Sequence, residues 1–106
     1  MGKAAVLKII AQFKDALEKK GIKIERIVLF GSYAAGRQRA GSDIDLVIIS
    51  NDFSAMGYWQ RIDLLSDAIY EVFKPIEAVA MTGAEWENGD SFIADFARNG
   101  EVVFAA

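Results

Sequence analysis

The middle of the chain reads VLFGSYAAGRQRAGSDIDLVII, residues 28–49. Two runs rich in β-branched and other apolar residues flank a linker that contains glycine, serine and arginine. Apolar β-branched runs favour extended strands, and a glycine-serine pair favours a turn. The pattern therefore predicts a strand over residues 24–30, a short helix over residues 33–39 and a second strand over residues 43–49.

The length of the linker decides how these two predicted strands pair. Ten residues separate Ser32 from Asp43, which is fewer than the roughly dozen residues that a parallel crossover with its helix needs. We therefore expect antiparallel neighbours, with the end of the first strand beside the start of the second. Gly31 and Ser32 then meet Asp43 and Asp45 at one edge of the sheet.

The rest of the chain continues the alternation of helix and strand. Apolar residues recur at helical spacing before Gly21 and again before Pro75, and Thr82 with Glu85 forms a capping-box pattern. With no linker or repeat to divide it, the sequence indicates one α/β (α+β) domain over residues 1–106, with flanking helices and a small mixed sheet of about four strands. The remaining predicted segments are a helix over 3–20, a loop over 51–57, a helix over 59–73, a strand over 76–81, a helix over 91–98 and a strand over 101–104.

The composition excludes several kinds of chemistry. The chain has no cysteine and no histidine. Disulfides, thiolate nucleophiles, zinc ribbons, imidazole ligands and Ser-His triads are therefore excluded. The side chains left for metal chemistry are carboxylates, which are hard oxygen ligands suited to Mg²⁺, Mn²⁺ or Ca²⁺.

Charge and hydropathy give expectations about partners and location. The formal net charge is −3, so we expect no strong non-specific binding to nucleic acid. No signal-like segment and no uncharged apolar stretch of about 18 residues occurs, which favours a cytoplasmic protein without membrane insertion. Hydrophobic residues make up 53% of the chain, which leaves apolar surface for a partner or a homo-oligomer. Four aromatic residues near predicted helix starts are assigned to core or partner packing rather than to base stacking: Tyr58, Trp59, Trp86 and Phe92.

Asp43 and Asp45 are the first candidate site residues. Two apart on a strand, they leave the same face with α-carbons roughly 6.5 Å apart. Such carboxylates repel each other unless they share a cation, so a divalent metal site is one interpretation and two water-facing aspartates on an edge strand is the other. Gly31 and Ser32 also have two interpretations: a phosphate cradle, in which glycine lets backbone amides approach the oxyanions, or an ordinary turn.

Four other polar residues extend this candidate site. Glu77 stands one residue into the third predicted strand, after a connection long enough for a parallel right-handed crossover. That crossover brings Glu77 to the same edge of the sheet, the alternative being a surface-facing Glu on an edge strand. Arg37 and Arg39 lie between cradle and aspartates as phosphate ligands or solvated charges, with Arg37 the better candidate. Ser42 either caps the turn or contacts a phosphate.

The segments 31–37 and 41–46 together resemble the signature of polymerase-beta-like nucleotidyltransferases, which is Gly-Ser, a spacer and Asp-x-Asp. The likeness extends to the minimal nucleotidyltransferases of prokaryotes, the MNT domains, whose ten-residue spacer also contains a glycine, here Gly36. It is specific over residues 28–49 and looser around Glu77 and at the chain end. It implies the nucleotidyltransferase fold and transfer of a nucleoside monophosphate from a triphosphate, with ATP as the expected donor. Minimal members usually carry Asp where Glu77 stands, and some antibiotic-modifying relatives carry Glu.

The resemblance also implies roles for the candidate residues. Asp43 and Asp45 would hold two Mg²⁺ ions, and Gly31 and Ser32 would bind the β- and γ-phosphates. Glu77 and the second metal would activate an acceptor hydroxyl for in-line attack on the α-phosphorus, with pyrophosphate leaving. Because the chain has no histidine, carboxylate and metal must do the work of the base.

Family members of this size are often encoded beside a small helical HEPN protein, and several such pairs resemble a toxin and its antitoxin. The resemblance therefore implies a HEPN partner, neutralised by adenylylation of a tyrosine or by binding. Three functions stay open: an enzyme that modifies this partner, a catalytically weak antitoxin that sequesters it, and a transferase acting on a small molecule such as an antibiotic. For the third, 106 residues leave little room for an acceptor pocket.

Overall fold

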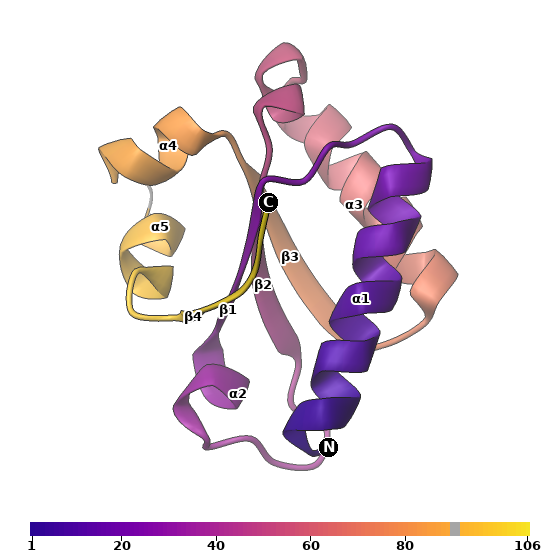
Figure 1. Cartoon of the computed structure of the whole chain (residues 1–106), viewed down its shortest axis with the longest axis vertical. Coiled ribbons are helices and arrows are strands. Elements are labelled where there is room, and N and C mark those ends of the chain that lie inside the picture. The colour runs from indigo at the N-terminus through magenta and orange to yellow at the C-terminus, as the bar shows by residue number, and fades with distance from the viewer. Residues whose placement is uncertain (90–91) are drawn as a thin grey trace.

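A computed structural model describes residues 1–89 and 92–106 of the chain. Its strands form one sheet, with helices on both faces (Figure 1). The elements follow in the order α1 (Lys3–Lys19), β1 (Arg26–Phe30), α2 (Gly31–Ala35), β2 (Ile44–Ile49), the 3-10 helix η1 (Asn51–Ala55), α3 (Tyr58–Val72), β3 (Ile76–Met81), α4 (Gly83–Asn88), α5 (Phe92–Ala97) and β4 (Glu101–Ala105).

The sheet has four strands in the order β3-β2-β1-β4. β1 pairs antiparallel with both β2 and β4, whereas β2 and β3 run parallel. The expected mixed sheet and the antiparallel pairing across the ten-residue linker are thus confirmed. The right-handed crossover rule explains why α3, which connects the parallel pair, packs against one face of the sheet.

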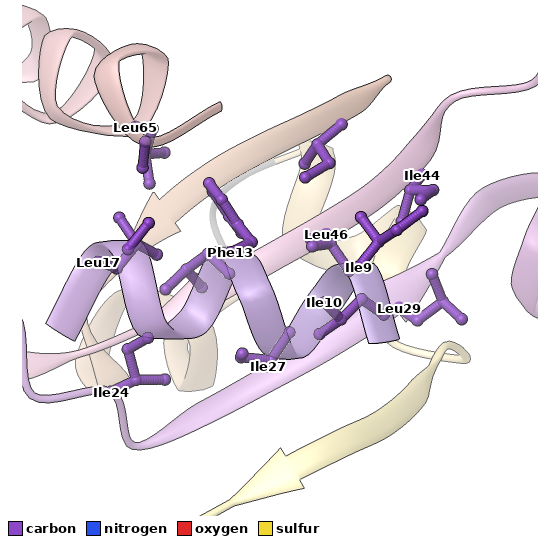
Figure 2. Close-up of a cluster of buried hydrophobic side chains, with 14 of the residues drawn as sticks. Ile9, Ile10, Phe13, Leu17, Ile24, Ile27, Leu29, Ile44, Leu46 and Leu65 are labelled. Atoms are coloured by element: carbon purple, nitrogen blue, oxygen red, sulfur yellow. The ribbon is translucent and has the colours of Figure 1, made fainter. Parts of the chain in front are cut away.

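The larger of the two cores lies between the sheet and helices α1 and α3. Figure 2 shows Phe13 and Leu17 of α1 in one cluster with Ile27 and Leu46 of the strands, and Leu65 of α3 lies at one end of it. Phe13, Leu17, Ile27 and Leu46 are wholly buried, and each such side chain contributes about 1.5–3 kcal/mol to folding. The helical spacing of apolar residues therefore predicted α1 correctly.

A second, smaller core lies on the opposite face, under α4 and α5 (Figure 1). Val28 and Val47 of the two central strands pack here with Trp86, Ala94 and Ala97. Because side chains alternate along a strand, each central strand is apolar on both faces over this stretch. The expected core role of Trp86 is confirmed.

Several boundaries differ from the predicted ones, for local reasons. The short helix begins at Gly31, directly after β1, and ends at Ala35 because Gly36 adopts a left-handed conformation with φ of 70°. β2 starts at Ile44, so Asp43 lies one residue outside the strand. The predicted loop over 51–57 contains η1, because the buried Ser50 hydroxyl accepts a hydrogen bond from the Asp52 amide at 3.1 Å.

Smaller shifts occur elsewhere. β1 begins at Arg26 rather than at residue 24, and β4 extends to Ala105. α3 ends at Val72, where Phe73 turns left-handed with φ of 57°, two residues before the proline expected to stop it. Of the helix predicted over 91–98, α5 occupies Phe92–Ala97, and residue 91 lies outside the described part of the chain. No described helix is both long and apolar enough to cross a membrane.

Candidate active site

Three residues from neighbouring strands stand side by side at one end of the sheet. Asp45 of β2 is paired with Phe30 of β1 on one side and with Glu77 of β3 on the other. Directly paired residues project from the same face of a sheet, with β-carbons about 4.5–5.5 Å apart in an antiparallel pair. The row Glu77, Asp45, Phe30 therefore lies on the face that carries α4 and α5, the face to which Val47 also points.

The carboxyl of Asp45 is the most perturbed group in this row. Partial burial, the nearby charges of Glu77 and Asp43, and a hydrogen bond shared with Glu77 together raise the pKa of Asp45 from 3.8 to about 6. Each of these causes disfavours the charged form. Glu77 and Asp43 are themselves exposed. The structure therefore brings the three predicted carboxylates into electrostatic contact, with Asp45 at the centre.

Gly31 lies directly against this carboxyl. Its φ is +73°, and a β-carbon placed on it would overlap Oδ2 of Asp45. Only glycine combines a left-handed conformation with such a close approach at no steric cost. Gly31 opens α2, so the backbone at the turn and the Asp45 carboxyl face one another. This is the meeting of cradle and carboxylate that the linker length predicted.

The three carboxylates are the kind of ligand that a hard divalent cation binds. Carboxylate oxygens are the ligands that Mg²⁺ prefers, and mutual repulsion among Asp43, Asp45 and Glu77 is what a bound cation would relieve. Within residues 1–89 and 92–106, however, no three acidic side chains are arranged as a ready set of ligands for one metal ion. Asp45 and Glu77, which are paired across β2 and β3, interact with each other in the metal-free protein, and this interaction helps to raise the pKa of Asp45.

A cavity of about 490 Å³ opens beside the cradle, between α2 and the segment that joins α5 to β4. Gly31, Ser32 and Arg37 line one side, and Phe96 and Asn99 line the other. Arg37 thus lies next to the Gly31-Ser32 turn, and its role as a phosphate ligand stays a prediction. Phe96 and Asn99 were not predicted as site residues. Their signal in the sequence is the aromatic helix and the Asn-Gly turn that precede β4.

The remaining predicted site residues have different positions. The Ser42 hydroxyl accepts a hydrogen bond from the Arg39 amide at 2.8 Å, so Ser42 caps the turn before β2. The Arg39 side chain is exposed and does not line the cavity beside the cradle. Of the two roles expected for Tyr58, Trp59 and Phe92, core packing is wrong, because they are 70%, 72% and 81% exposed, and partner packing stays a prediction.

Comparison with known proteins places this geometry in a family. The family model for the nucleotidyltransferase domain matches residues 10–88, which include the cradle, both aspartates and Glu77. No curated protein matches the chain. The matched segment contains the carboxylate row and the turn at Gly31, and it leaves out α5 and β4.

Solved structures share the fold. A candidate nucleotidyltransferase from Sulfolobus solfataricus is 20% identical, with a TM-score of 0.62 over 99% of this chain and 90% of that chain. A toxin-antitoxin complex with AMP-PNP is 20% identical, with a TM-score of 0.63 over 91% of this chain and 73% of that chain. The complex of the tri-AMPylated Shewanella oneidensis HEPN toxin with an MNT antitoxin is 19% identical, with a TM-score of 0.57 over 100% of this chain and 74% of that chain. Together with the family model, the cradle and the carboxylate row show that this chain belongs to the nucleotidyltransferase domain family.

Proposed function

We propose that this chain is a Mg²⁺-dependent transferase that moves AMP from ATP to a hydroxyl group of a small helical HEPN protein. The observation that carries the proposal is the position of the Asp45 carboxyl, held between Glu77 and the backbone of Gly31. A carboxylate whose charge is disfavoured by its neighbours, beside a turn open to anions, suits a site that receives a cation together with a polyphosphate.

Each residue of the site would have a separate task. Asp43 and Asp45 would hold two Mg²⁺ ions, which when bound neutralise the triphosphate and lower the pKa of the acceptor hydroxyl. The amides at Gly31 and Ser32, with Arg37 beside them, would bind the β- and γ-phosphates. Glu77 would take the proton of the acceptor hydroxyl.

The reaction then balances without any further reactant. The acceptor oxygen forms its bond to the α-phosphorus, and the bond from that phosphorus to the bridging oxygen of the β-phosphate breaks. Pyrophosphate leaves with the electron pair, and the acceptor proton passes to Glu77 and then to water. No histidine is needed, consistent with a chain that has none.

Two observations support a protein acceptor. Among the structures that share this fold, one is a toxin-antitoxin complex with AMP-PNP and another holds a tri-AMPylated HEPN toxin with an MNT antitoxin. In addition, α3 and its end carry large exposed aromatic side chains, among them Trp59, Tyr70 and Phe73 at 72%, 80% and 80%. Exposed aromatic residues are enriched where proteins bind one another.

Two assays test this proposal. Calorimetry with Mn²⁺ and ATP should show metal-dependent binding that is lost when Asp43→Asn and Asp45→Asn are combined. Label from α-labelled ATP should pass to a co-expressed HEPN partner with wild type and not with that double variant. An Asp15→Asn protein, altered at an exposed carboxylate of α1, should behave as wild type in both assays. Equal nucleotide binding by wild type and double variant would contradict the proposal.

A catalytically weak antitoxin is the second candidate. The aromatic residues of α3 suit sequestration of a partner, and no described set of three acidic residues is prearranged for one cation. On this hypothesis wild type and the double aspartate variant neutralise the partner equally well, and no label is transferred. Replacing Trp59 and Tyr70 by Asp would then abolish partner binding while leaving nucleotide affinity unchanged.

A further inference from the structure

We propose that the cavity between α2 and α5 is the subsite for the base and ribose of the nucleotide, with the Phe96 ring as stacking platform. This inference rests on the proposed function, because it places the nucleoside of the same triphosphate. It adds a recognition element from α5 and from the turn before β4, which lie beyond the segment that the family model covers.

The cavity has the size and lining of a nucleoside site. Its volume is about 490 Å³, within the range of small-molecule sites. Phe30, Phe96 and the alanines of α2 make the lining mainly apolar, while the amide of Asn99 offers both a donor and an acceptor. Among the described residues that line it, Arg37 is the only charged one. A site for the triphosphate alone needs more hydrogen-bond donors and less aromatic surface than this cavity has.

The aromatic rings around Phe96 leave its own ring accessible for stacking with a base. The Phe30 ring meets Phe96 edge to face, with centroids 6.0 Å apart and planes at 78°. The Phe92 ring stacks on Phe96 from the same helix, with centroids 6.4 Å apart and planes at 24°. Phe96 is supported by both rings and is still 61% exposed. An apolar ring of this kind in a cavity wall is suited to hold a planar base.

The cavity also lies at a suitable distance from the carboxylates. Asp45 pairs with Phe30 across one strand spacing, and the next strand along, β4, begins just after Gly100 of the cavity wall. Two strand spacings are about 10 Å. A nucleotide whose α-phosphate lies at Asp45 therefore has room to place its ribose and base over Phe30 and against Phe96, while its β- and γ-phosphates contact the turn at Ser32.

The test compares Mg-ATP with Mg-tripolyphosphate, which has the phosphates and lacks the nucleoside. Titration calorimetry on Phe96→Ala should show Mg-ATP binding weakened by about five- to a hundredfold, because a base-aromatic stack is lost. Affinity for Mg-tripolyphosphate should not change. Tyr70→Ala, which removes a ring that is 80% exposed on α3, on the other face of the sheet, should alter neither affinity. Ala35→Phe, which puts a ring into the cavity from α2, should weaken Mg-ATP only.

Two results would overturn the assignment. If Phe96→Ala and Ala35→Phe bind Mg-ATP as wild type does, the base does not occupy the cavity. If Phe96→Ala weakens both ligands equally, the cavity holds phosphates. The proposed function is tested separately by wild type: binding of Mg-tripolyphosphate upholds the metal and phosphate site even where the base assignment fails, whereas binding of neither ligand refutes both.

Discussion

Gly31 and Asp45 face each other so closely that a β-carbon at position 31 would overlap Oδ2 of the aspartate. Gly31 begins α2 directly after β1, whereas Asp45 lies in β2, and the antiparallel register of Phe30 with Asp45 brings the two together. A larger residue at position 31 would either displace the carboxyl or move the turn. The turn and the carboxylate are therefore one structural unit.

Substitution of Gly31 by Ala should disturb both stability and binding. Its φ of +73° costs an L-residue about 1–2 kcal/mol, and the overlap with Asp45 adds to that cost. We expect a lower free energy of unfolding by about 2–3 kcal/mol and Mg-ATP binding weaker by about tenfold or more. Urea denaturation and calorimetry measure these two effects.

Gly21→Ala is the matched control for Gly31→Ala. Gly21 has φ of +92° at the end of α1, with nothing within 4 Å of an added β-carbon. The Gly21→Ala variant should have a similar backbone strain but no loss of nucleotide affinity. If Gly31→Ala binds Mg-ATP as tightly as Gly21→Ala does, the contact with Asp45 has no part in binding.

Asp45→Asn should stabilise the metal-free protein in a pH-dependent way. The pKa of Asp45 is about 6 in the folded protein against an ordinary value of 3.8. Between these two pH values the native state therefore keeps a proton on Asp45 that the unfolded chain has already released. The free energy of unfolding of wild type therefore falls as pH rises from about 4 through 6. Because solvent reaches the carboxyl and screens its charge, we expect a gain of about 1 kcal/mol for Asp45→Asn at about pH 7.5 in chelator.

Near pH 4 that gain should largely vanish, since the native carboxyl is then protonated in wild type. Chemical denaturation at both pH values measures the difference, with Asp63→Asn on α3 as the control expected to show no gain. A gain of equal size at both pH values would mean that charge on Asp45 is not its cause.

Glu77→Gln should slow transfer far more than it weakens nucleotide binding. The change keeps the size of the side chain and removes the charge proposed to take the acceptor proton. Turnover should fall by about tenfold or more, about 1.4 kcal/mol for each tenfold, with nearly unchanged affinity for Mg-ATP. Label transfer from α-labelled ATP measures this turnover, and Glu87→Gln at an exposed site on α4 is the control expected to transfer as wild type does. If Glu77→Gln transfers label at the wild-type rate, Glu77 has no part in the reaction.

Thr82→Ala should destabilise the fold and leave the site intact. The Thr82 hydroxyl accepts from the Glu85 amide at 3.1 Å, and the Glu85 carboxylate accepts from the Thr82 amide at 2.8 Å. Loss of this cap should cost about 1 kcal/mol and lower Tm by about 4–8 °C. Thr82→Ser keeps the hydroxyl and should have the same Tm as wild type. Equal melting of the Ala and Ser variants would contradict the role of the cap.

The parts predicted well from the sequence depend on local spacing. The ten-residue linker is shorter than the roughly dozen residues that a parallel crossover needs, which favoured the antiparallel pairing that β1 and β2 have. That inference alone placed Gly31 beside Asp45. The capping box at Thr82 and the left-handed Gly21 also follow from residues a few positions apart. Element ends were less accurate, because one left-handed residue such as Gly36 or Phe73 decides them.

The sequence by itself therefore determined the fold class and the meeting of the Gly-Ser turn with the aspartates, because local chain geometry leaves few alternatives. Only the tertiary structure decided that Asp45 is the perturbed carboxyl, that Trp59 and Phe92 stay exposed, and that Phe96 closes a cavity beside the turn. These properties depend on which helix covers which part of the sheet. Hydrophobic periodicity identifies an apolar face but not its neighbour, since packing joins residues far apart in the chain.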